Sequence, residues 1–144
     1  MKTGEPTSIL GSREDYMGKG ESILVVDDIE EQRDSASRIL ERLCYSVTPV
    51  SSGEEAIDYL KDYAVDLLIL DMIMDPGIDG LETYRRILEF HLDQKALIVS
   101  EFPETDRVRE AQRLGAGAYV KKPLFLEKIG PAVRDELDTI RMTL

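Results

Sequence analysis

The stretch LLILDMIMDPGIDG, from Leu67 to Gly80, decides the fold of this chain. Its apolar run ends at Asp71, and a turn that contains Pro76 and Gly77 follows. An apolar run of this length between polar residues is typical of a strand buried on both faces of a sheet. Asp71 is then expected at the C-terminal end of that strand, where open parallel sheets bind ligands. A lone Asp at a strand end is more often a turn residue, so its role depends on residues elsewhere in the chain.

The composition predicts one globular domain with a hydrophobic core. The chain has 144 residues, of which 42% are hydrophobic and 33% are charged. The apolar runs are too short to cross a bilayer, and the N-terminus MKTGEPTSIL lacks the apolar core of a signal peptide, so we expect a cytoplasmic protein without membrane contact. The net charge of -11 argues against nucleic acid binding. Cys44 is the single cysteine, which excludes an internal disulfide and predicts a small apolar filler.

Strand-like runs alternate with helical spacing along most of the chain. Residues 1–20 show no sustained period and are expected to be a flexible linker or tail, and residues 21–144 are expected to form the domain. The expected strands cover residues 22–26, 45–50, 67–71, 96–100 and 118–120. The expected helices cover about 30–43, 53–62, 81–91 and 105–114, and a last helix begins near 126. Pro131 follows Gly130 inside that last pattern and predicts a kink or a late start.

Five strands that alternate with five helices predict an α/β fold, a doubly wound parallel sheet with helices on both faces. We expect the flavodoxin-like strand order 2-1-3-4-5, because the other common order needs a sixth strand. That order places the first and third strands side by side. Asp27 and Asp28, which end the first strand, are therefore expected to converge with Asp71.

Three crowded carboxylates indicate a phosphoryl-transfer site that holds a divalent cation. Their repulsion would be neutralised by Mg²⁺, which prefers oxygen ligands and could also gather phosphoryl oxygens. Asp71 could then attack phosphorus and form an acyl phosphate. Such transfer also needs a cation and a hydroxyl donor, and Lys122 and Ser100 follow strands that end at the same edge. Each residue alone has an ordinary explanation as a turn, cap or solvated loop residue, but together they favour function.

The motifs LVVDD, LLILDMIM with PGIDG, IVS and GAGAYVKKP resemble, in order and spacing, the receiver domains of bacterial two-component response regulators and hybrid sensor kinases. The resemblance covers about residues 21 to 141. It implies that Asp71 accepts a phosphoryl group from a phosphohistidine on a histidine kinase or phosphotransfer protein. It also implies a Mg²⁺ site made by Asp28, Asp71 and the backbone carbonyl of Ile73, with Asp27 helping through water.

The same resemblance implies the residues that respond to the phosphoryl group. Ser100 would be the switch hydroxyl, and Tyr119 the aromatic residue that turns inward with it. Lys122, rather than Lys121, matches the family lysine because it directly precedes Pro123, in a peptide bond that is commonly cis in the family. The output surface would be formed by the fourth helix, the fifth strand and the fifth helix.

Three features depart from the family pattern. Asp75 is an extra residue between the acceptor and the Pro-Gly turn, and it adds a charge near the site. Glu101 follows the switch hydroxyl where the family usually has Gly or Ala, so it could hinder a phosphodonor or alter the lifetime of the acyl phosphate. The step from Gly130 to Pro131 affects the shape of the last helix and any partner contact there.

Two alternatives remain open on the sequence. Glu101 and Asp75 could mark a receiver-like interaction module that works without phosphate. An Asp-nucleophile phosphatase is less favoured, because the second acid expected two residues after the nucleophile is replaced by Ile73. The expected activity is signalling, limited to self-catalysed phosphoryl transfer and autodephosphorylation.

The expected partner is a separate phosphodonor. His91, the single histidine, is expected to be an ordinary helix-end residue, so the donor must be another domain or protein. The chain is expected to be a monomer or weak dimer. The segment YMGKGESILVVDD resembles the junction that follows the kinase core of a hybrid sensor kinase, which suggests a C-terminal receiver. A single-domain regulator is the alternative.

Overall fold

The five apolar runs form a parallel sheet in the order β2-β1-β3-β4-β5, as the sequence predicted. The computed structural model describes residues 13–140. Its strands are β1 (Ser22–Val26), β2 (Ser46–Val50), β3 (Leu67–Asp71), β4 (Ala96–Ser100) and β5 (Tyr119–Lys121). Its α-helices are α1 (Glu30–Arg42), α2 (Gly53–Asp62), α3 (Gly80–Ile87), α4 (Asp106–Leu114) and α5 (Leu126–Asp138).

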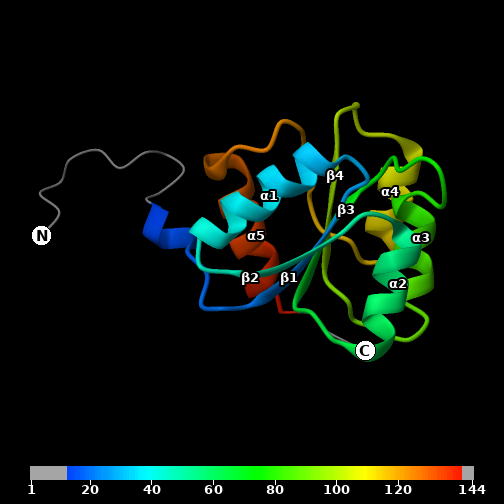
Figure 1. The fold of residues 1–144 in the computed structure, drawn as a ribbon, viewed down its shortest axis with the longest axis horizontal. Coiled ribbons are helices and arrows are strands. Elements are labelled where there is room, and N and C mark those ends of the chain that lie inside the picture. The colour runs from blue at the N-terminus through cyan, green and yellow to red at the C-terminus, as the bar shows by residue number, and fades with distance from the viewer. Residues whose placement is uncertain (1–12, 141–144) are drawn as a thin grey trace, which may run out of the picture.

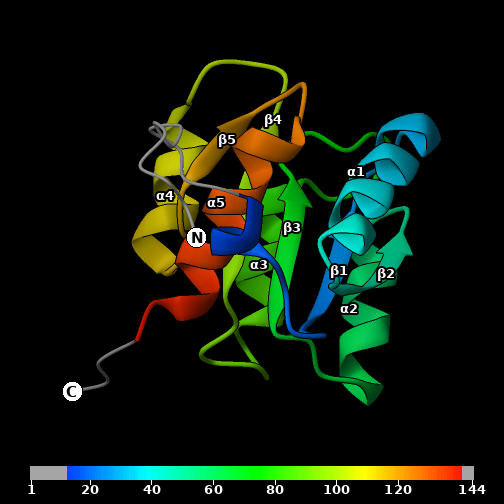
Figure 2. The same cartoon turned by 90° about the vertical axis from the view of Figure 1, so that its left-hand side faces the viewer.

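Helices cover both faces of the sheet because successive strand residues point to opposite sides. Along β3, Leu68 and Leu70 pack in a cluster with α2, α3 and α4, whereas Leu67 and Ile69 pack in a second cluster with α1 and α5. Figures 1 and 2 show the sheet between these two helical layers. Burial on both faces explains why β3 and β4 are continuous apolar runs rather than alternating ones.

Side-chain caps fix the starts of three helices. Ser52 begins α2 and Thr105 begins α4, since each side chain accepts a hydrogen bond from a backbone amide in the first turn. Asp79 caps α3 in the same way, so this helix begins one residue earlier than expected. It also ends at Ile87 rather than near His91. Gly115 ends α4 with φ of 128°, a conformation that favours glycine.

Residues 13–20 differ from the expected flexible tail. Arg13–Tyr16 form a short 3₁₀-helix, and the Tyr16 side chain is only 5% exposed. The ring of Tyr16 lies against Gly130 of α5, where an added Cβ would come within 2.3 Å of it. The hydroxyl of Tyr45 donates to the carbonyl of Tyr16 at 3.2 Å. This segment is therefore packed on the domain, and residues 1–12 lie outside the described part of the chain.

Helix α5 begins at Leu126 and continues through Pro131, so it lacks the late start that the sequence predicted as the alternative to a kink. Pro131 lacks an amide hydrogen, which removes one helical hydrogen bond in the second turn, but the helix buries Ile129 and Val133 against the sheet. Tertiary packing on both sides of the proline outweighs the local cost. The small Gly130 also leaves the space that Tyr16 fills.

Cys44 is not the apolar filler that the sequence predicted. It is exposed and has φ of 71°, in the turn between α1 and β2. Within residues 13–140, no helix is long and apolar enough to span a membrane.

Candidate functional site

Asp71 ends β3 in a buried position at the C-terminal edge of the sheet. Its side chain is 6% exposed. It is paired in register with Val99 of β4, and the next amide, that of Met72, donates to the Val99 carbonyl at 3.0 Å. The carboxylate is thus carried by a strand that is buried along its whole length and fixes its position.

Asp27 and Asp28 converge with Asp71, as the strand order predicted. One carboxylate oxygen from each of the three lies within 4.8 Å of the others. Asp27 is held by the start of α1, because its Oδ1 accepts from the Ile29 amide at 2.9 Å and its carbonyl accepts from Arg33 at 2.8 Å. Asp28 Oδ2 accepts from the Asp75 amide at 3.3 Å. The three carboxylates therefore form one acidic cluster at this sheet edge.

Lys122 supplies the positive charge beside this acidic cluster. Its Nζ lies 2.8 Å from Asp27 Oδ2 and 3.4 Å from Asp71 Oδ1. The side chain is 8% exposed, and the backbone amide of Lys122 donates to the Ser100 carbonyl at 2.8 Å, which fixes the turn after β5. The peptide bond between Lys122 and Pro123 is cis, as the resemblance implied. Lys121 is exposed and plays no part in these contacts.

Ser100 and Tyr119 lie at the same edge on β4 and β5. Ser100 is 3% exposed, and its Oγ accepts from the Phe102 amide at 3.2 Å, so its hydroxyl hydrogen is free to donate elsewhere. The Tyr119 hydroxyl is buried near Ser100 but makes no well-formed hydrogen bond to any residue in 13–140. Burial raises the pKa of this hydroxyl.

The loop between β3 and α3 folds back over the end of β3. The amide of Gly80 donates to the Met72 carbonyl at 2.8 Å, and a Cβ on Gly80 would lie 2.5 Å from the Asp71 carbonyl oxygen. Only glycine fits this close approach. Ile73 is half exposed in this loop and lines one small cavity together with Asp28 and Asp71.

The extra residue of this loop, Asp75, contributes its backbone amide to Asp28, and its own side chain is exposed. The peptide bond from Asp75 to Pro76 is cis. The extra residue therefore adds a hydrogen bond to a carboxylate of the acidic cluster as well as a nearby charge.

Burial dominates the electrostatics of the site. It raises the pKa of Asp71 to about 7. Lys122 opposes this rise, whereas the charges of Asp27 and Asp28 add to it. The ammonium of Lys122, which pairs with Asp27 and Asp71, thus does not balance the cost of burying three carboxylates so close together.

The acidic cluster fits a divalent cation. Asp28 Oδ1 is buried and has no hydrogen-bond partner in the described part of the chain, which is costly for a charged oxygen. The set of carboxylate oxygens suits Mg²⁺, and a cation here would satisfy that oxygen and relieve the repulsion around Asp71. Such an ion would share the cluster with Lys122, which contacts Asp27 and Asp71 but is not in contact with Asp28.

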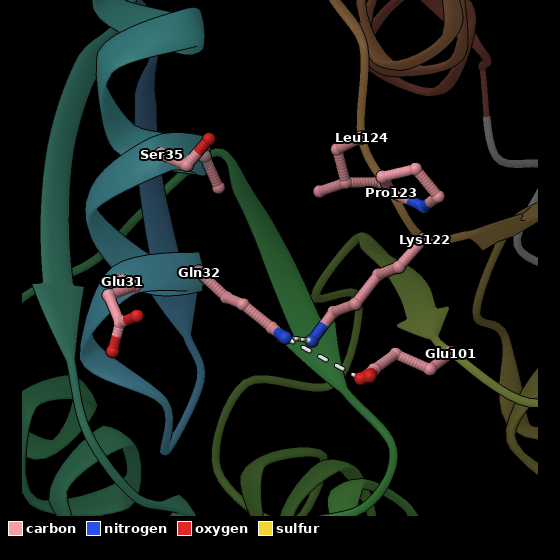
Figure 3. A pocket seen from close by; sticks show the side chains of 8 residues that line it. Glu31, Gln32, Ser35, Glu101, Lys122, Pro123 and Leu124 are labelled. Carbon is pink, nitrogen blue, oxygen red and sulfur yellow. Dashed lines mark hydrogen bonds between the residues drawn. The ribbon is translucent and has the colours of Figure 1, made fainter.

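Sequence reasoning did not identify Gln32 of α1 as part of the site. Its Oε1 accepts from Lys122 Nζ at 2.5 Å, and its Nε2 lies 3.5 Å from Glu101 Oε1. Gln32 follows Asp28 by four residues, so its place on the first turn of α1 was a usable signal. Figure 3 shows these three side chains meeting beside a cavity.

His91 lies at the other edge of the sheet. Its Nε2 is 2.7 Å from the Leu60 carbonyl, and it borders a cavity with Asp66 and Lys95, which precede β3 and β4. It is therefore remote from Asp71, as expected for a residue that takes no part in the site.

The fold and the site together define a class of protein. An open parallel sheet carries an acidic cluster, a lysine and a hydroxyl on the C-terminal ends of four strands, which is where such sheets bind ligands. A buried carboxylate, two further carboxylates that could hold a metal ion, and a lysine have the composition of a phosphoryl-transfer site.

Comparison with known proteins shows the family. Residues 23–134 match the model of the response regulator receiver domain. The chain is 30% identical over 115 residues to the chemotaxis protein CheY of Halobacterium salinarum. This match covers 80% of this chain and 95% of that protein. It is 30% identical over 117 residues to sporulation initiation phosphotransferase F of Bacillus subtilis, with 81% and 94% covered.

A CheY-like receiver domain from Methanospirillum hungatei has the same fold, with a TM-score of 0.77 at 23% identity, over 83% of this chain and 95% of that one. This chain belongs to the response regulator receiver domain family. A phosphoacceptor role in two-component signalling is consistent with that family.

Proposed function

We propose that this chain is a phosphorylation-controlled receiver in which Asp71 accepts the phosphoryl group. The observation that supports this most is the position of Asp71, buried at the end of β3 with Lys122 on one side and two further carboxylates on the other. The donor is a phosphohistidine on a histidine kinase or phosphotransfer protein, because the single histidine of this chain lies at the other sheet edge.

The proposed phosphoryl transfer is a single displacement at phosphorus. An Oδ oxygen of Asp71 forms a bond to phosphorus while the bond from phosphorus to the donor imidazole nitrogen breaks, and that nitrogen leaves with the electron pair. The carboxylate becomes an acyl phosphate. Lys122 donates to one phosphoryl oxygen and Ser100 donates its hydroxyl hydrogen to another, which stabilises the charge that develops there.

Asp28, Asp71 and the carbonyl of Ile73 would hold Mg²⁺, with Asp27 acting through water. When bound, the ion neutralises the carboxylates and the phosphoryl oxygens. The unpartnered Asp28 Oδ1 supports this assignment. The activity is signalling, with phosphoryl transfer and autodephosphorylation as the associated chemistry.

The phosphoryl group would act on the surface made by α4, β5 and α5. Movement of Ser100 toward the phosphoryl group would pull the loop that leads to α4 in the same direction. The Tyr119 side chain could follow, because its hydroxyl is buried near Ser100 and has no well-formed hydrogen bond in the described residues to hold it in place. We propose that the chain acts as a monomer or weak dimer, in the cytoplasm, without binding nucleic acid, which its net charge of -11 disfavours.

The test is the mass of the intact protein after incubation with Mg²⁺ and a small acyl phosphate. The wild type should gain one phosphoryl group, and Asp71→Asn should gain none. Asp75→Asn is the matched control, because Asp75 is an exposed carboxylate that lines the same small cavity as Asp28 and Asp71. A phosphoryl group retained by Asp71→Asn would refute the assignment, and absence of labelling in wild type would favour a module that works without phosphate.

A further inference from the structure

Lys122 reaches the acidic cluster along the wall of a cavity that the proposed reaction does not use. The cavity has a volume of about 480 Å³ and lies between α1 and the connection from β5 to α5. Gln32 and Ser35 line it from α1, and Glu101 lines it from the end of β4. Figure 3 shows that Gln32 extends across this cavity to the tip of Lys122.

The three N–H groups of the Lys122 ammonium are shared unequally among its neighbours. Gln32 Oε1 accepts at 2.5 Å and Asp27 Oδ2 accepts at 2.8 Å. Asp71 Oδ1 is 3.4 Å away, beyond the usual range of a hydrogen bond to a charged group. Two N–H groups therefore have close acceptors, which leaves the third for Asp71 without a close bond to it.

The amide of Gln32 has one orientation that satisfies both of its neighbours. An ammonium group only donates and a carboxylate only accepts, so the amide oxygen must face Lys122 and the amide nitrogen must face Glu101. The structure has this arrangement, with Nε2 lying 3.5 Å from Glu101 Oε1. Glu101, the residue that departs from the family pattern, thus helps to orient Gln32.

We propose that Gln32 is a positioning residue that holds the Lys122 ammonium away from the free Asp71 carboxylate and ready for a phosphoryl oxygen. This inference rests on the proposed function of Asp71 and adds a residue that controls the rate of its phosphorylation. Glu101 supports Gln32, so this residue assists phosphorylation instead of only repelling the donor.

Loss of the acceptor at residue 32 would move the ammonium toward Asp71. Besides Asp27, the carboxylate paired with Lys122 is Asp71, whose Oδ1 lies 3.4 Å away and could accept from the freed N–H group. A closer bond to that oxygen stabilises the carboxylate before reaction and occupies the atom that attacks phosphorus. Only interactions that strengthen in the transition state accelerate a reaction, so this bond slows phosphorylation.

The test uses one variant that removes the acceptor and one that restores it. Gln32→Met keeps the length of the side chain but cannot accept from Lys122. The double variant Gln32→Glu with Glu101→Gln exchanges the carboxylate and the amide, which preserves both contacts and the net charge. Ser35→Ala is the matched control, since Ser35 lies one turn further along α1 and lines the same cavity.

The first readout is the rate constant of phosphorylation by a small acyl phosphate with Mg²⁺. Loss of a hydrogen bond to a charged group predicts a fall of roughly tenfold in Gln32→Met. Ser35→Ala should keep the wild-type rate, and the double variant should recover most of it. A wild-type rate in Gln32→Met would overturn the inference. A slow double variant would also overturn it, because a packing role would then explain the loss.

The second readout needs neither phosphate nor Mg²⁺. The side-chain ammonium signal of Lys122 in the NMR spectrum of nitrogen-15-labelled protein is assigned by its absence in Lys122→Arg. It should shift in Gln32→Met and return in the double variant. If the wild type is never phosphorylated, the proposed function fails, and this signal alone decides whether Gln32 positions Lys122. An unchanged signal in Gln32→Met would reject the positioning role.

Discussion

Asp71→Asn should make the metal-free protein more stable at pH 8. The folded pKa of Asp71 is raised from 3.8 to about 7, mainly by burial. A difference of this size between the folded and unfolded pKa lowers the free energy of unfolding by about 4 kcal/mol at a pH where Asp71 is charged in both the folded and the unfolded chain. Asparagine still buries a polar group, so we expect a gain of about 2–4 kcal/mol in the free energy of unfolding.

The pH dependence gives the sign of this effect a separate check. Between about pH 4 and pH 7 the folded chain keeps a proton on Asp71 that the unfolded chain has released, so the stability of the wild type falls as the pH rises through this window. Asp71→Asn has no such proton and should lack this part of the fall. The two proteins should therefore approach each other in stability near pH 4.

The assay is urea unfolding followed by circular dichroism, in buffers that contain a chelator, from pH 4.5 to pH 8.5. The chain has no tryptophan, so circular dichroism is the direct probe. Asp75→Asn is the control, because this exposed carboxylate should change stability little. Parallel curves for wild type and Asp71→Asn, or a less stable Asp71→Asn at pH 8, would refute the argument that burial dominates the site.

Three further outcomes follow from the structure. Mg²⁺ at 100 times its dissociation constant should stabilise wild type by about 2.7 kcal/mol in thermal or urea unfolding, and Asp28→Asn should lose most of this gain. An equal gain in both proteins would argue against the acidic cluster as the metal site. Gly80→Ala should destabilise the fold by about 1–3 kcal/mol, because the added Cβ would lie 2.5 Å from the Asp71 carbonyl oxygen. A Gly80→Ala protein as stable as the wild type would contradict this and show that the loop can relax. Tyr16→Ala should lower the free energy of unfolding in urea by about 3–5 kcal/mol, whereas Leu92→Ala, at a side chain that is 78% exposed, should lower it little. An effect of Tyr16→Ala as small as that of Leu92→Ala would mean that the N-terminal segment contributes nothing to the stability of the fold.

The convergence of the site residues could be predicted because it depends on backbone rules. Strand period, parallel connections and strand order place the ends of four strands at one edge, whatever the side chains do there. Asp27, Asp28, Asp71, Ser100 and Lys122 all follow from these rules. Their convergence needed only the positions of polar residues after apolar runs.

The features that were missed depend on packing between distant segments. Nothing local in residues 13–20 indicates that Tyr16 will fill the space beside Gly130, more than 100 residues later in the sequence. The same contact explains why the Gly130 and Pro131 pair is tolerated inside α5, where local propensity alone predicted a kink or a late start. Similarly, the exposed Cys44 has a positive φ that its residue type does not suggest.

The contact between Gln32 and Lys122 shows the same limit at the level of the site. The position of Gln32, four residues after Asp28, is compatible with a place near the sheet edge, but the sequence does not show which acceptor Lys122 would choose there. The structure gives Lys122 two close acceptors and leaves Asp71 at 3.4 Å. If the phosphoryl group attaches to Asp71 as proposed, its oxygens would lie on the side of the one N–H group without a close bond. An ammonium held in this way could bind a phosphoryl oxygen without first releasing the carboxylate that is proposed to attack phosphorus. The proposal therefore predicts that the partner of Lys122 on α1 affects the rate.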